Sequence, residues 1–184
     1  MRAVLDANVF YSTWVTDPLL CMADAELYEP VWSGRIMDEV REHLPSVWRR
    51  ATREGVERYL HTLSMAFPEA MVEGWEPLEE MVVGLPDPDD RHVVAAAIRS
   101  GSGVVVTSNL KDFPDTCLDR FGLRAVSPDD FLSMLFDDDP DAAAAAIRGL
   151  VESKRHPPRT MAEEAGRLRG LGLTRFAERL ATME

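Results

Sequence analysis

Four acidic residues, far apart in the sequence, have the side chains best suited to chemistry: Asp6, Glu39, Asp90 and Asp112. Carboxylate oxygens are good ligands for hard divalent cations such as Mg²⁺ or Mn²⁺, and Mg²⁺ keeps several waters beside a few carboxylates. A cation held in this way can activate a bound water and neutralise charge on a phosphate. The sequence supports such a site only if the fold brings these acids together.

Asp6 ends the apolar run with which the sequence opens, "MRAVLDANVF". Turns that follow strands often contain Asp, so Asp6 could simply end the strand. The other interpretation places Asp6 at the carboxyl end of a buried parallel strand, where open α/β sheets carry their binding sites. Partners for Asp6 elsewhere in the chain decide between the two.

Asp90 lies at the start of a helical pattern, "DPDDRHVVAAAIRS". Acidic residues at 87–90 suit a helix N-terminus, because they can cap it and interact with the helix dipole. Asp90 also precedes Val93, Val94 and Ala97 at helical spacing, which puts it on the face that packs inward. A carboxylate that faces a core is costly without a cation or hydrogen-bond donors, so Asp90 is a candidate functional residue.

Glu39 and the residues after the second apolar run give weaker signals. Glu39 flanks the apolar stripe of its predicted helix, and by itself it is more typical of a solvent-facing side chain. Thr107, Asn109 and Asp112 follow the apolar run of "GVVVTSNLKDFP", where turn residues are ordinary. If the protein has no such site, each of the four acids needs a separate structural explanation.

The histidines and the known catalytic motifs offer less. The histidines show no metal-ligand spacing, and we expect His92 to lie at a helix surface. The sequence contains neither a Gly-rich phosphate loop nor a Gly-x-Ser-x-Gly motif. The densest basic group within residues 1–136 consists of Arg49, Arg50, Arg53 and Arg58, which either bind phosphates or balance the neighbouring glutamates.

The hydrophobic pattern predicts strands separated by helices. Short apolar runs at 3–5, 104–106 and 123–126 are typical of strands, and the pattern between the first two is helical. This alternation indicates an α/β fold with parallel strands. The remainder is predicted as helices, with one at 140–153 and two shorter ones after a Thr160–Glu163 capping box.

Length and charge suggest one domain with an appendage, a core domain at 1–136 and a helical extension at 137–184. Residues 1–136 carry 12 Arg and Lys against 23 Asp and Glu, whereas 137–184 carry 8 against 9. This acidity argues against nucleic-acid binding over the whole surface but allows a local basic groove or a cation site. The apolar residues of the extension must pack on their own domain or on a partner: Leu168, Leu171, Leu173, Phe176 and Leu180.

The sequence also predicts the compartment. It contains no apolar stretch long enough to span a bilayer and no signal-peptide pattern, so we expect a cytoplasmic protein without a membrane partner. Cys21 and Cys117 are too few for a disulfide framework and fit no metal spacing. We expect both to be reduced.

Four segments, in this order, resemble the PIN-domain nucleases: "VLDANVF", "SGRIMDEV", "PDPDDRHVVAAAI" and "VVVTSNLKDFP". Within that family they are similar to the VapC-type toxins of bacterial toxin–antitoxin pairs, over about residues 2–136, and the extension is similar to that of a subgroup. The resemblance implies a PIN-like three-layer sandwich with a mostly parallel central sheet flanked by helices. It places the family's first three acids at Asp6, Glu39 and Asp90. Asn109 stands where many VapC-type proteins have a fourth acid, so the fourth position falls on Asp112.

The resemblance also implies a function, that of an endoribonuclease dependent on Mg²⁺ or Mn²⁺. The four acids would hold one or two ions that activate water for attack on an RNA phosphodiester. Asn8 would hold Asp6 in place, Thr107 or Asn109 would orient a water or a phosphate oxygen, and the basic group at 49–53 would bind RNA phosphates. The expected partners are RNA, an antitoxin protein and a second copy of the chain in a homodimer.

Two alternatives stay open. A phosphatase of the haloacid-dehalogenase type also begins with a strand that ends in Asp, but that chemistry needs a second Asp where Asn8 stands. A non-catalytic PIN-like module would bind a protein partner instead. Such a module has no reason to direct Asp6 and Asp90 at one point.

Overall fold

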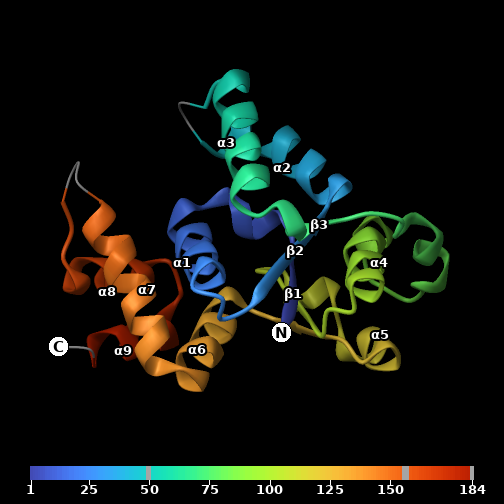
Figure 1. The fold of residues 1–184 in the computed structure, drawn as a ribbon. Helices are drawn as coiled ribbons and strands as arrows, with labels where there is room; N and C mark the ends of the chain where they lie inside the picture. The colour runs from blue at the N-terminus through green and yellow to red at the C-terminus, as the bar shows by residue number, and fades with distance from the viewer. Residues whose placement is uncertain (49–50, 155–157, 183–184) are drawn as a thin grey trace. The chain divides into compact units, whose positions relative to one another are not determined.

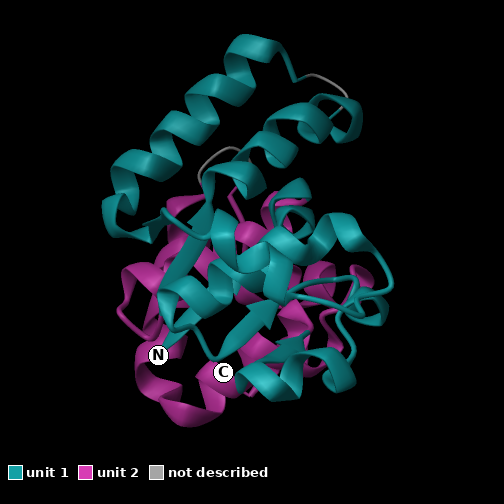
Figure 2. Cartoon of the chain, turned by 90° about the vertical axis from the view of Figure 1, so that its right-hand side faces the viewer, with its two compact units in different colours: residues 1–11, 29–126 teal, residues 12–28, 127–184 magenta. Residues whose placement is uncertain are grey.

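The computed structural model describes residues 1–48, 51–154 and 158–182. The chain folds into two compact units, coloured separately in Figure 2. Unit 1 consists of residues 1–11 and 29–126, and unit 2 consists of residues 12–28 and 127–184. The predicted division at residue 136 follows the order of the sequence and stays a prediction. The spatial units differ from it because residues 12–28 and 127–136 group with the C-terminal helices.

Unit 1 is built on a parallel β-sheet with the strand order β3-β2-β1-β4-β5. The strands are β1 (Arg2–Leu5), β2 (Glu29–Ser33), β3 (Met71–Val72), β4 (Val104–Val106) and β5 (Arg124–Val126). The residues of β4 are all buried, as expected for a strand inside a parallel sheet that is covered by helices. The predicted α/β fold with a mostly parallel sheet is therefore confirmed.

The purely helical prediction between residues 5 and 104 was wrong at two places. β2 and β3 lie there, and each escaped the pattern for a physical reason. β2 contains Pro30, a residue that weakens a strand signal, and β3 has only two residues. Both strands pair in the sheet because their neighbours supply the hydrogen bonds.

The carboxyl ends of β1 and β4 place polar residues side by side. The backbone N–H of Asp6 donates to the Val106 carbonyl at 3.1 Å, and that of Thr107 donates to the Val126 carbonyl at 3.0 Å. These bonds continue the parallel ladders by one residue beyond the strands. Asp6 and Thr107 therefore follow neighbouring strands at the same edge of the sheet.

The helices of unit 1 are α2 (Gly34–Val47), α3 (Arg53–Ala66), α4 (Arg91–Ser100) and α5 (Asp115–Leu118). Ser33 accepts a hydrogen bond from the Ile36 N–H and so caps the start of α2. Gly101 adopts a left-handed conformation, with φ of 68°, and ends α4. Figures 1 and 2 show α2 and α3 lying side by side and extending away from the sheet.

Short 3₁₀ segments lie between the strands and helices. Ala7–Tyr11 follows β1, Leu110–Asp112 follows β4, and Pro88–Asp90 precedes α4. The others are Pro68–Ala70, Glu76–Met81 and Asp119–Phe121. A 3₁₀ turn of a few residues is short enough to keep a polar side chain close to the strand end that it follows.

Unit 2 is helical and consists of α1 (Thr13–Asp24), α6 (Pro128–Asp138), α7 (Pro140–Ser153), α8 (Met161–Gly170) and α9 (Thr174–Ala181). The predicted helix at 140–153 and the Thr160–Glu163 capping box are confirmed. Tyr28 is buried, with its ring edge-on to Phe131 at 4.9 Å and its hydroxyl donating to the Leu19 carbonyl. Among the described helices, none combines the length and the apolar character needed to cross a membrane.

Candidate functional site

Asp6 is the most firmly held of the four acids. Its side chain is almost fully buried, and its Oδ2 accepts hydrogen bonds from Thr107 Oγ1 at 2.7 Å and from Asn8 Nδ2 at 2.5 Å. Asn8 is fixed in turn, because its Oδ1 accepts from the Ser108 N–H at 2.9 Å. Burial raises the pKa of Asp6, although the hydrogen bond from Thr107 acts in the opposite direction. Asn8 therefore contacts the carboxylate that it is expected to hold in place, and its role in a metal site stays a prediction.

Glu39 projects from α2, and its polar contacts with described residues fall on one oxygen. Oε1 lies 2.8 Å from Nε2 of His92 and 3.4 Å from Nε of Arg35. Within the described residues, no hydrogen bond or ion pair reaches Oε2. Burial acts to raise the pKa of Glu39, but the contacts with His92 and Arg35 outweigh it and the pKa is lowered. Glu39 is therefore charged at neutral pH and has one oxygen available.

Asp90 ends the 3₁₀ turn that leads into α4. Asp87, one of the acidic residues expected to cap this end of the helix, begins the turn by accepting a hydrogen bond from the Asp89 N–H at 2.9 Å. No donor from the described part of the chain reaches the Asp90 carboxylate. Burial, together with the negative charges of Asp6, Asp87 and Asp112, raises the pKa of Asp90 to about 7. A cation at this position would displace the proton and relieve the repulsion.

Asp112 and Asn109 form a pair in the turn after β4, in which Asn109 Nδ2 donates to Asp112 Oδ2. Asn109 is itself positioned by its backbone N–H, which donates to Thr107 Oγ1 at 3.0 Å. The negative charge of Asp112 is one of those that raise the pKa of Asp90. The assignment of Asp112 as the fourth acid stays a prediction, and so does the expected role of Asn109 in orienting a water or a phosphate oxygen. The structure shows that Asn109 also donates to Asp112.

The four acids lie within electrostatic range of one another in a chain of pairs. Asp6 interacts with Glu39 and Asp90, and Asp90 interacts with Asp112. In the described ranges, however, no three His, Cys, Asp or Glu side chains are already gathered closely enough to hold a metal ion. Mutual repulsion of carboxylates opposes such a gathering until a cation is present. Carboxylate oxygens are the donors that a hard divalent cation prefers. In three of the four acids, one oxygen already contacts a donor, which leaves the other oxygen oriented for a cation.

The prediction that His92 lies at a helix surface was wrong. His92 is only 1% exposed and lies against Trp75, with ring centroids 6.0 Å apart. The prediction failed because α4 is covered on two sides, by the strands of the sheet and by the 3₁₀ segment Glu76–Met81. The unbroken run of small apolar residues after His92 was the available signal, because a helix apolar all round is buried all round.

Tyr11 is a second residue near the acids, and no pattern in the sequence singles it out. Burial, followed by the negative charges of Glu39 and Asp6, raises the pKa of Tyr11 to about 12. The phenol therefore stays protonated at neutral pH and keeps a hydrogen to donate. Its proximity to the acids depends on the turn that follows β1, which local sequence does not reveal.

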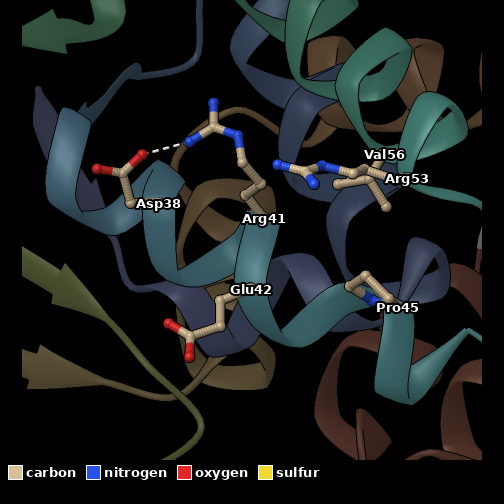
Figure 3. A pocket seen from close by; sticks show the side chains of 6 residues that line it. All are labelled: Asp38, Arg41, Glu42, Pro45, Arg53 and Val56. Atoms are coloured by element: carbon tan, nitrogen blue, oxygen red, sulfur yellow. Dashed lines mark hydrogen bonds and ion pairs between the residues drawn. The ribbon is translucent and has the colours of Figure 1, made fainter.

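The arginine prediction is only partly described by the structure, because Arg49 and Arg50 lie outside the described residues. Arg53 is exposed at the start of α3, and no ion pair joins it to another described residue. Figure 3 shows Arg53 reaching toward Arg41 across a pocket between α2 and α3. The pocket is lined by Asp38, Arg41, Glu42, Pro45, Arg53 and Val56. Arg41 is paired with acids of both helices, so Arg53 is the freer of these two cations.

Comparison with known proteins gives two family matches and one relative. A family model described as "PIN domain" matches residues 2–111, and one described as "VapC50 C-terminal domain" matches residues 128–182. The chain is 46% identical over 71 residues to the protein named "Putative ribonuclease VapC50" of Mycobacterium tuberculosis (strain ATCC 25618 / H37Rv). That alignment spans 39% of this chain and 42% of the relative. No solved structure matches the chain.

The first family model covers more than half of the sequence and agrees with the observed fold. Its range contains β1 to β4 and three of the four acids, Asp6, Glu39 and Asp90. The resemblance inferred from the four sequence segments is confirmed by this match. The chain therefore belongs to the PIN domain family.

Proposed function

We propose that the protein is an endoribonuclease dependent on Mg²⁺ or Mn²⁺ that acts as the toxin of a toxin–antitoxin pair. The observation that carries the proposal is the set of four acids around the carboxyl ends of β1 and β4, three with one oxygen held and one with a strongly raised pKa. Membership of the PIN domain family and similarity to a protein named as a ribonuclease support it.

In this proposal Asp6, Glu39, Asp90 and Asp112 are the residues that hold the cation. When bound, the cation supplies an activated water and neutralises negative charge on the phosphodiester. The chain's own residues prepare the ligands: Asn8 and Thr107 fix Asp6, and Asn109 fixes Asp112. The pKa of Asp90 is raised mainly by burial and by negative neighbours. A bound cation would offset these effects and lower the pKa, so Asp90 would release its proton.

The partner proposals follow from the same family relationship. An RNA substrate is consistent with the name of the relative, and Arg53, which no ion pair joins to a described residue, offers a cation for its backbone phosphates. A cognate antitoxin would block the acid cluster with a basic side chain while its apolar residues contact nearby helices. We also propose that two copies of the chain form a homodimer. The match to a VapC50 C-terminal domain supports the assignment of the toxin type.

The alternatives are less well supported. Membership of the PIN domain family leaves no basis for a haloacid-dehalogenase-type phosphatase, and Asn8 holds Asp6 instead of supplying a second acid. A non-catalytic interaction module has no use for a half-buried Asp90 whose charge is opposed by three other carboxylates. The cost of keeping this arrangement is typical of a functional site.

Cleavage of a defined RNA tests the proposal. The wild-type protein with Mg²⁺ should cleave it, and EDTA should abolish cleavage. Asp6→Asn should lower the rate by about 100-fold or more, because a charged ligand is lost while the amide oxygen still accepts from Thr107. Asp89→Asn is the matched control, because Asp89 is an exposed acid beside Asp90, and it should cleave at the wild-type rate. Wild-type cleavage by Asp6→Asn, or cleavage that persists in EDTA, contradicts the proposal.

A further inference from the structure

The buried imidazole of His92 is polar and has incomplete hydrogen bonding. The residue is 1% exposed, packed beside Trp75 in the first turn of α4. In the described part of the chain, neither Nδ1 nor Nε2 has a hydrogen-bond partner of directed geometry. A buried polar group without a partner costs about 1–3 kcal/mol, so an apolar residue would be the cheaper choice at this position.

The one close polar contact of His92 with a described residue is with Glu39. Nε2 lies 2.8 Å from Glu39 Oε1, which is a hydrogen-bond length, although the N–H direction is not aligned with the oxygen. Two lone pairs at this distance would repel, so Nε2 must carry the proton. Contacts of this kind are often poorly aligned before ligand binds and tighten afterwards.

The contact also selects which oxygen of Glu39 is available. Arg35 approaches the same Oε1, at 3.4 Å, and within the described ranges Oε2 has no partner. Arg35 is more than half exposed, so solvent weakens its hold, whereas the buried ring of His92 is fixed by packing. His92 therefore has the stronger influence on the orientation of the carboxylate.

We propose that His92 is a positioning residue, whose Nε2–H holds Oε1 of Glu39 so that Oε2 stays free to bind the divalent cation. The proposal rests on the proposed function, because it assigns Glu39 to a cation site. Donors of this kind orient ligating carboxylates, and their loss typically lowers metal affinity about 10- to 100-fold. His92 itself does not touch the cation.

Mn²⁺ affinity of the full-length protein, measured by isothermal titration calorimetry without RNA, tests the proposal. His92→Leu removes the donor and should weaken binding about 10- to 100-fold. His92→Gln carries an N–H at about the position of Nε2 and should stay close to wild type, whereas His92→Asn is too short and should resemble His92→Leu. The Gln and Asn variants are a matched pair, and they decide the question even if the Leu variant does not fold.

A double-mutant cycle separates positioning from a general structural effect. In a Glu39→Gln background, His92→Leu should not weaken Mn²⁺ binding further, because the carboxylate that it orients is already gone. Equal affinity of wild type, His92→Asn and His92→Leu overturns the proposal but leaves the metal-dependent function standing. Equal weakening by His92→Gln and His92→Asn also overturns it. No Mn²⁺ binding by the wild type overturns both proposals.

Discussion

Asp90 is the residue at which the electrostatic cost of the candidate site is greatest. Its pKa is raised from 3.8 to about 7, first by burial and then by Asp6, Asp87 and Asp112. Between these two pH values the folded protein binds a proton that the unfolded chain has released. The free energy of unfolding therefore falls as pH rises through this window, and the loss is complete above about pH 7.

This linkage predicts that Asp90→Asn stabilises the metal-free protein at high pH. In EDTA, urea unfolding at about pH 8 should show the variant more stable than wild type by about 1–2 kcal/mol, a value discounted because Asp90 is partly exposed. At about pH 4 the two proteins should differ little, because Asp90 is then largely protonated in wild type. Asp89→Asn serves as the control and should follow wild type. An equal gain at both pH values would show that charge is not the cause.

The identity of the fourth acid is also decided at the residue scale. Asp112→Asn should lower RNA cleavage by about 10-fold or more, because it removes a charged ligand. Asn109→Ala should lower it less, since Asn109 only donates to Asp112. Initial rates at saturating Mg²⁺ measure both effects. The reverse order would mean that the fourth position belongs to Asn109.

At the scale of elements, the sequence predicted the parts that local pattern determines. The buried strands β1 and β4 follow from apolar runs, α7 follows from helical spacing, and the start of α8 follows from the Thr160–Glu163 capping box. β2 and β3 could not be predicted in this way, because the proline in β2 and the two-residue length of β3 leave no clear local pattern, and both strands depend on pairing with strands that are distant in the sequence.

The same distinction between local pattern and distant contacts applies to the residues of the candidate site. Asp6 and Asp90 could be selected because one ends an apolar run and the other faces inward on a helix. Glu39 needed the family resemblance, since its own spacing favoured solvent. The pairing of His92 with Glu39 joins α4 to α2, and no local pattern could reveal it.

The α2–α3 pair makes a prediction about RNA binding. Arg53→Gln should reduce the slope of log affinity against log salt by about 0.7, because one phosphate contact is lost. Arg2→Gln is the control, since Arg2 is exposed but paired with Glu29 at the opposite end of β1. Binding is measured with a catalytically inactive Asp6→Asn background over a range of salt. An unchanged slope would show that Arg53 contacts no RNA phosphate and is only a solvent-exposed surface residue.

At the scale of the whole chain, the C-terminal helices belong to a unit that also contains residues 12–28 and 127–136. The apolar face predicted for the extension is mostly used inside this unit, because Leu168, Phe176 and Leu180 are buried. Asp129 accepts from the backbone N–H groups of Arg175 and Phe176 and so joins α6 to α9. Leu171 is the exception, at 42% exposed.

The composition of unit 2 predicts how the chain responds to truncation. Deletion of 137–184 would remove α7–α9 from α1 and α6 and uncover apolar residues such as Phe131, so the truncated chain should bind a hydrophobic dye and unfold at a lower temperature. Phe176→Ala should cost about 3–5 kcal/mol in urea unfolding, whereas Leu171→Ala should change stability by less than about 0.5 kcal/mol. A truncated chain as stable as wild type would show that unit 2 is not cooperative.

The central claim, that four acids from separate segments form one cation site, is tested most directly by locating the ion. Crystals of the wild-type protein grown with Mn²⁺ should show an anomalous difference peak bordered by carboxylate oxygens of Asp6, Glu39, Asp90 and Asp112. The peak should be absent from isomorphous crystals of Asp6→Asn. The account is contradicted if no peak is found among these residues at Mn²⁺ concentrations that support RNA cleavage, or if an ordered ion is bound by other ligands.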